Sequence, residues 1–116
     1  MKFTEWPADA QPMCKPSDAA RVIELCASRG VDSALLHAED LTQNFFDLSS
    51  GEAGEILQKL RTYRIRIGVV YKPDQVRFSS RFGEMAQEEA RTGYFRLFES
   101  EQSAREWLGR DRAQEA

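Results

Sequence analysis

The amino-acid sequence predicts a single domain of the α/β class, with a mostly parallel or mixed sheet of about four strands and about four helices. The 116 residues are enough for one hydrophobic core that needs no metal or disulfide as a staple. Short apolar segments rich in β-branched residues alternate with segments of helical periodicity. This alternation is typical of right-handed β-α-β crossovers, which join parallel strands.

Residues 1–16 are expected to form an N-terminal arm or an edge strand, and residues 17–116 to form the domain itself. The arm holds three of the four prolines of the chain. Proline is confined to the edges of sheets because it has no backbone N–H to donate to a neighbouring strand. Only Lys2–Trp6 has the composition of a short extended piece.

The first helix is expected to begin at Ser17, and the first full strand to cover Asp32–Ala38. Ser17 and Asp18 supply the cap region, and Gly30 ends the helix because glycine readily adopts the left-handed conformation at that place. One helix face is apolar at the i, i+3, i+4 and i+7 spacing of a core-facing stripe. That stripe consists of Ala19, Val22, Ile23 and Cys26.

The second helix is expected directly after an aromatic pair and a serine-rich turn. Ser49, followed three positions later by Glu52, has the form of a capping box, in which two side chains satisfy free backbone amides. Phe45 and Phe46, just before the turn, are expected to be core anchors. The apolar stripe of this helix consists of Ala53, Ile56, Leu57 and Leu60.

The segment Ile65–Tyr71 is the clearest strand, since it is rich in β-branched residues and is followed by Pro73 and Asp74. Its nearly continuous apolar end is typical of a strand that is buried on both faces. We therefore expect it at the centre of the sheet, between the strands Asp32–Ala38 and Tyr94–Phe98.

The last two helices frame the final strand. The third helix is expected over Phe78–Arg91, and Gly93 closes it. The strand Tyr94–Phe98 follows, and the last helix opens at Ser100. The order of elements after the arm is therefore helix and strand in strict alternation.

The composition argues against several classes of function. Sixteen basic and nineteen acidic residues give a net charge of -3, and the basic residues are spread along the chain, so a nucleic-acid partner is not expected. No apolar run approaches the roughly eighteen residues of a membrane span, and no signal-peptide core is present at the N-terminus. We expect a soluble, cytoplasmic protein without a membrane partner.

The cysteines and the histidine do not indicate a metal or catalytic centre. Cys14 and Cys26 lack zinc-ligand spacing and are expected to be ordinary free thiols. His37 is the only histidine and is expected to be structural or on the surface, because a Cys/His or Ser/His catalytic pair would need a long-range geometry that the sequence gives no reason to expect. No cofactor is expected.

The serine-rich turn is the candidate functional surface. A helix N-terminus favours a negative charge, so a serine there is suited to regulation by phosphorylation, and the same amides could bind an anion. A purely structural cap is the alternative. The candidate regulatory or partner surface consists of Asp47, Ser49, Ser50, Gly51, Glu52 and Gly54.

These residues also carry two resemblances. The segment Phe45–Gly51, running into Ala53–Lys59 and then Tyr63, resembles the bacterial domain-of-unknown-function family 4180 over about residues 41–71. More distantly, the element order and the turn Asp47–Gly51 are similar to STAS domains of anti-sigma-factor antagonists, whose turn carries a regulatory phosphoserine. Ser50, just before Gly51, occupies that position. The resemblance implies a STAS-like fold and a switchable binding module.

The resulting prediction is a non-enzymatic regulatory or protein-binding module with an unknown protein partner. The alternative is a small enzyme or an anion- or nucleotide-binding domain. For an enzyme, Glu39, Asp40 and Asp47 could together hold a magnesium ion near the carboxyl edge of a parallel sheet, where open α/β sheets tend to bind ligands. The serine-rich turn would serve the anion-binding version.

A homodimer is also expected. The family resembled normally begins with two short strands, and the arm is too short and too rich in proline to supply both. An exposed sheet edge would remain, and a second copy of the chain would cover it.

Overall fold

The computed structural model describes residues 3–7, 16–41, 43–47, 51–74 and 76–109. Within them, four strands form one sheet in the order β1-β2-β3-β4, and every neighbouring pair is parallel. The strands are β1 (Thr4–Glu5), β2 (Ser33–His37), β3 (Arg66–Val70) and β4 (Phe95–Phe98). The helices are α1 (Ala19–Arg29), α2 (Glu52–Thr62), α3 (Ser80–Thr92) and α4 (Glu101–Leu108). Short 3-10 turns are η1 (Pro16–Asp18), η2 (Ala38–Asp40) and η3 (Gln43–Phe46). The predicted α/β class is confirmed.

Strand β3 lies between β2 and β4, so the predicted central strand is confirmed. Its register places Gly68 beside Leu35 of β2 and beside Arg96 of β4. Strand β1 lies at the outer edge, where Thr4 and Glu5 pair with the middle of β2. The arm therefore supplies an edge strand of the same sheet.

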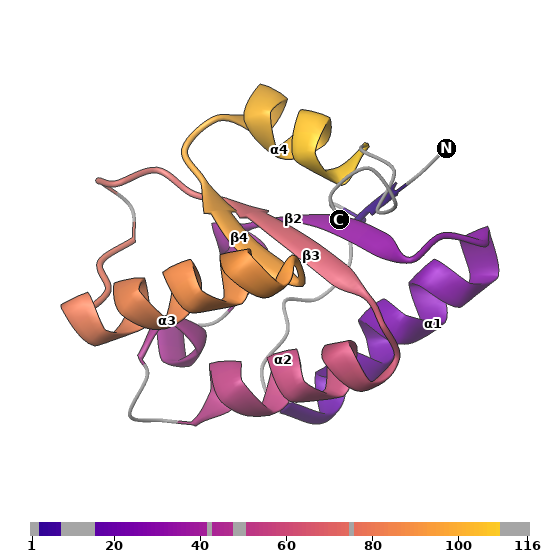
Figure 1. Cartoon of the computed structure of the whole chain (residues 1–116), viewed down its shortest axis with the longest axis horizontal. Coiled ribbons are helices and arrows are strands. Elements are labelled where there is room, and N and C mark those ends of the chain that lie inside the picture. Colours follow the sequence, from indigo (N-terminus) through magenta and orange to yellow (C-terminus); the bar gives the residue numbers. More distant parts are fainter. Residues whose placement is uncertain (1–2, 8–15, 42, 48–50, 75, 110–116) are drawn as a thin grey trace.

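Helices α1, α2 and α3 cover one face of the sheet, and α4 alone covers the other (Figure 1). The strand order equals the chain order, so each right-handed crossover places its helix on the same side. Helix α4 follows the last strand and connects no pair of strands. It is therefore free to cover the opposite face.

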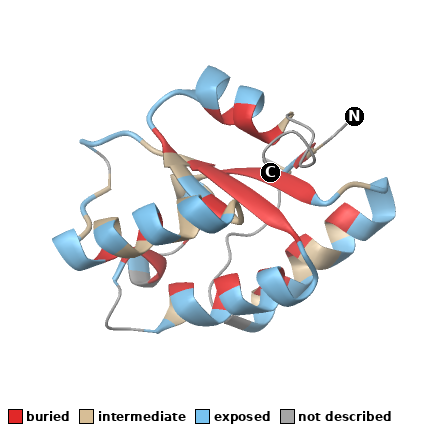
Figure 2. Ribbon diagram, viewed as in Figure 1, coloured by how far each residue is buried: buried red, intermediate tan, exposed pale blue. Residues whose placement is uncertain are grey.

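The core is divided by the sheet into a larger and a smaller part. Along β2, Leu36 belongs to the larger core, with the three crossover helices, and Leu35 belongs to the smaller core under α4. Figure 2 shows the buried colour along β2 and β3, as expected for strands covered on both faces. The smaller core consists of Leu35, Phe98, Ala104, Trp107 and Leu108.

Two residues of β3 allow α4 to pack closely. A Cβ atom on Gly68 would lie 3.3 Å from Leu108 Cδ1 and 3.3 Å from Phe98 Cε2, which is tighter than ordinary contact. Arg66 is 1% exposed, and its guanidinium carbon lies 4.6 Å from the centroid of the Trp107 ring. The short helix is thus held by side-chain packing and by a buried cation.

The glycine-marked helix ends follow the sequence signals, but helix starts lie later than expected: α1, expected from Ser17, begins at Ala19 because Pro16–Asp18 form a 3-10 turn. Gly30 and Gly93 end α1 and α3 at φ 68° and 83°, as predicted. The third helix was expected from Phe78, but it begins at Ser80. The reason is the hydroxyl of Ser79, which accepts a hydrogen bond from the Phe82 backbone N–H at 3.2 Å and caps the helix.

Candidate functional site

The candidate turn lies between two buried segments, η3 and α2. Phe45 and Phe46 are buried before the turn, and Ala53 and Ile56 are buried after it. The ring of Phe45 packs edge-on against Phe46 at 5.3 Å between centroids and contacts Phe95 of β4 at 5.9 Å. The expectation that the aromatic pair anchors the core is confirmed. The turn is therefore attached firmly at both ends.

The expected capping box is wrong. Gly51 is the N-cap of α2, with φ 76°, and Glu52 is the first helical residue. A box with Ser49 would need Glu52 at the third helical position, but the left-handed conformation at Gly51 prevents the helix from extending further back. Ser49 and Ser50 lie outside the described residues. No side chain among the described residues caps this helix end.

The described residues of the candidate surface differ in exposure. Asp47, Gly51 and Gly54 are exposed, and Glu52 is half-buried. Glu52 and Glu55 place two carboxylates in the first turn of α2. Negative side chains at this position favour the helix because they oppose the positive end of its dipole. The same two charges also reduce the attraction of this helix end for another anion.

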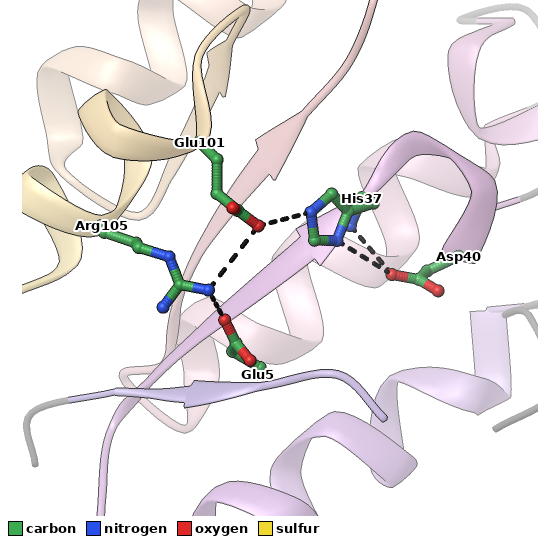
Figure 3. A network of polar contacts seen from close by, with 5 residues as sticks. All are labelled: Glu5, His37, Asp40, Glu101 and Arg105. Carbon is green, nitrogen blue, oxygen red and sulfur yellow. Dashed lines mark hydrogen bonds and ion pairs between the residues drawn. The ribbon is translucent and has the colours of Figure 1, made fainter. Parts of the chain in front are cut away.

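A second cluster, which the sequence did not predict, links both ends of the chain to β2 (Figure 3). His37 Nε2 lies 3.0 Å from Glu101 Oε1, and the Asp40 carboxylate accepts a hydrogen bond from the His37 backbone N–H at 2.9 Å. Glu101 Oε1 also lies 3.6 Å from Arg105, whose guanidinium forms a close ion pair with Glu5. We call these five residues the polar network.

The polar network lies where β1 and β2 end and α4 begins. Its side chains are partly exposed, so each pair is worth only about 0–1 kcal/mol. The His37–Glu101 pair could transfer a proton, but the described contacts of His37 contain no nucleophile. The sequence held a signal for one contact of the polar network, because Glu101 and Arg105 have the i, i+4 spacing of a helical ion pair. The pairing of residues 64 positions apart had no such signal.

A hollow of about 360 Å3 lies near the carboxyl end of β2, on the side of the larger core. Leu41 and Phe46 supply buried apolar walls, and Glu39 and Gln43 are exposed at its rim. Val76, in the loop after β3, completes it together with Ala38. The hollow combines apolar walls with a few polar groups, as small-molecule sites do.

The acidic group proposed for magnesium is not assembled. Among the described residues, no three histidine, cysteine, aspartate or glutamate side chains gather closely enough to hold a metal ion. Asp40 is instead engaged with the backbone of His37. Burial raises the pKa of the Asp40 carboxyl, and this hydrogen bond partly opposes the rise.

The structure describes one of the two cysteines. Cys26 is free and buried, and burial, aided by the charge of Asp32, raises the pKa of its thiol to about 11. A thiol of this kind is protonated and unreactive at neutral pH. The expectation of an ordinary free thiol is confirmed for Cys26. Cys14 lies outside the described residues.

The fold and its sites define a small parallel α/β domain with helices on both faces of its sheet. The chain matches the family described as "Domain of unknown function (DUF4180)" over residues 1–108, and it belongs to that family. The match extends well beyond residues 41–71, where the resemblance was strongest. No curated protein and no solved structure matches the chain, so the likeness to STAS domains stays a prediction. No helix in the described part of the chain is long and apolar enough to cross a membrane.

Proposed function

We propose that the domain is a non-enzymatic regulatory module that binds a protein partner through the turn Asp47–Gly54. The observation that carries the proposal is that the exposed residues Asp47 and Gly51 lie between buried residues on both sides. Phe46 precedes it at 3% exposure, and Ala53 in its last part is fully buried. Anchors of this kind lower the entropic cost of presenting the residues next to them to a partner.

The charge of the turn supports a regulatory role. Asp47 is exposed, and Glu52 and Glu55 follow in the first turn of α2. A phosphate on Ser50 would add up to two negative charges beside these carboxylates and would change the local potential strongly. A partner that recognises the unmodified turn would then bind less well.

A photoreactive amino acid at Gly54 tests whether this surface meets a partner. Gly54 is exposed, and no atom lies within 4 Å of a Cβ built there, so we expect a side chain at this position to extend into solvent. The control carries the same amino acid at Gln87, an exposed position on α3. After irradiation in native cells, we expect one defined protein adduct at Gly54 and none at Gln87. Equal adduct patterns at both positions would contradict the proposal.

The competing function, an anion- or nucleotide-binding domain, finds less support at this helix end. Glu52 and Glu55 already occupy the first turn of α2 with negative charge. A free anion would have to approach against that charge, and no lysine stands in the turn as it does in a P-loop. Protein binding is therefore the function that we propose.

A further inference from the structure

We propose that the hollow lined by Ala38, Glu39, Leu41, Gln43, Phe46 and Val76 binds a small organic cation, namely a primary amine on a compact apolar body. The lining shares no residue with the partner surface Asp47–Gly54, although Phe46 directly precedes that surface, and the test below needs no protein partner. The proposal is based on the place of the hollow in the sheet, on its lining and on its charge.

The place is one where parallel α/β sheets bind ligands. Residues 38–46 follow the carboxyl end of β2, and Val76 follows the carboxyl end of the neighbouring strand β3. Two adjacent connections of a parallel sheet thus form the walls. The carboxyl edge is the side of a parallel sheet on which ligands bind, and here the two loops form the hollow without a reversal of the strand order.

The lining and the size fit a small molecule with an apolar body. Leu41 and Phe46 are 6% and 3% exposed, and Val76 and Ala38 are half-buried, so the apolar walls belong to fixed parts of the core. Phe46 is further held by Phe82, with ring centroids 5.7 Å apart. A volume of about 360 Å3 lies at the lower end of the range of roughly 300–1,000 Å3 typical of ligand pockets.

The charge of the rim selects a cation. Glu39 is exposed at the rim and brings a carboxylate, and Gln43 adds an amide that can accept a hydrogen bond. No arginine or lysine is among the described residues that line the hollow. An ammonium group would therefore meet attraction at the rim, whereas a carboxylate or phosphate of the same size would meet repulsion.

Charged groups on the neighbouring loop lie outside the lining of the hollow. The loop that carries Val76 also contains Lys72, Asp74 and Arg77, all of them exposed, and none of them lines the hollow. Glu39 is the charge that a bound ligand would meet directly.

The test uses 2-phenylethylamine as the cationic probe and 3-phenylpropanoate as an anion of similar size and shape. Backbone amide signals of the full chain are followed by NMR during titration with each compound. We expect saturable shifts at Leu41, Phe46 and Val76 with the amine and no saturable shifts with the carboxylate. Equal response to the two compounds, no saturation with the amine, or shifts confined to other residues would overturn the proposal.

Two variants locate the charge contact. Glu39→Gln should weaken amine binding about three- to fivefold, the loss expected for one partly exposed charge pair. Glu88→Gln is the matched control, because Glu88 is an exposed glutamate on α3 that does not line this hollow. It should leave amine binding unchanged. Equal affinities of the two variants would contradict the role of Glu39 and, with it, the selection of a cation.

Discussion

Arg66 of β3 donates a hydrogen bond to the carbonyl oxygen of Trp107 in the last turn of α4, with 2.9 Å between nitrogen and oxygen. A longer contact of 3.4 Å reaches the carbonyl of Leu108. The last carbonyls of a helix have no partner within it, and the negative end of the helix dipole attracts a cation. Arg66 thus satisfies the end of α4 from within the smaller core.

Replacing this arginine should destabilise the fold. Arg66→Met keeps much of the apolar length but removes the donors and the charge, so the carbonyls of Trp107 and Leu108 lose a buried donor. We expect a loss of about 2–3 kcal/mol in the free energy of unfolding, measured by urea denaturation. Arg66→Lys should cost less, because it keeps the charge. Unfolding of Arg66→Met at the wild-type urea concentration would contradict this role.

Two glycine substitutions should act in opposite directions. Gly68→Ala would bring a Cβ atom 3.3 Å from Leu108 and Phe98, and should cost about 1–2 kcal/mol by overpacking under α4. Gly54→Ala lies in α2 with open space around it, and should stabilise the protein by about 0.5–1 kcal/mol through helix propensity. Thermal unfolding of both variants measures the signs. Equal changes in the melting temperature of the two variants would show that the close packing of α4 against Gly68 does not contribute to stability.

The polar network should stabilise the packing of the first turn of α4 against β2. Glu101→Gln weakens the contact with His37 and removes the charge that Arg105 meets. We expect faster amide hydrogen exchange in the first turn of α4 and a loss of about 0.5–1 kcal/mol. Glu106→Gln is the control, since the described contact of Glu106 is with Gln102 of the same helix. Equal exchange rates in the two variants would contradict a link to the sheet.

The buried thiol of Cys26 should give a measurable dependence of stability on pH. Folding raises the pKa of this thiol from 9.0 to about 11, so the unfolded chain releases the proton first. The free energy of unfolding therefore falls as pH rises between these two values. Cys26→Ala should lack the fall that comes from this thiol. The free energies of unfolding of wild type and Cys26→Ala, measured from pH 8 to 11, should therefore change differently with pH. Parallel curves would contradict the burial of the thiol.

Local patterns predicted most of the fold. The β-branched segment that contains Val69 indicated the central strand, and Gly30 and Gly93 marked helix ends, because these signals depend on neighbouring residues alone. The serine and glutamate of the apparent capping box were misleading for the same reason. Their spacing fits the box, but Gly51 adopts the left-handed conformation at the N-cap and leaves Glu52 as the first helical residue.

Contacts between distant segments had no local signal. The pair of His37 with Glu101 and the contact of Arg66 with Trp107 depend on α4 lying across β2 and β3, and the sequence does not state on which face a terminal helix packs. The hollow likewise needs two loops from different strands. The expected homodimer stays a prediction, although β1 now covers part of the edge on which that expectation was based.

The most direct test of the proposed function is the affinity of the partner captured at Gly54 for two aspartate variants. Ser50→Asp places a negative charge in the turn. Ser80→Asp places the same charge at the first position of α3, where Ser80 is exposed, and serves as the control. Both variants should unfold like wild type, because an anion is tolerated at a helix N-terminus. We predict that Ser50→Asp weakens partner binding at least tenfold while Ser80→Asp leaves it unchanged. Equal affinity of wild type and Ser50→Asp would contradict a regulatory partner surface at this turn.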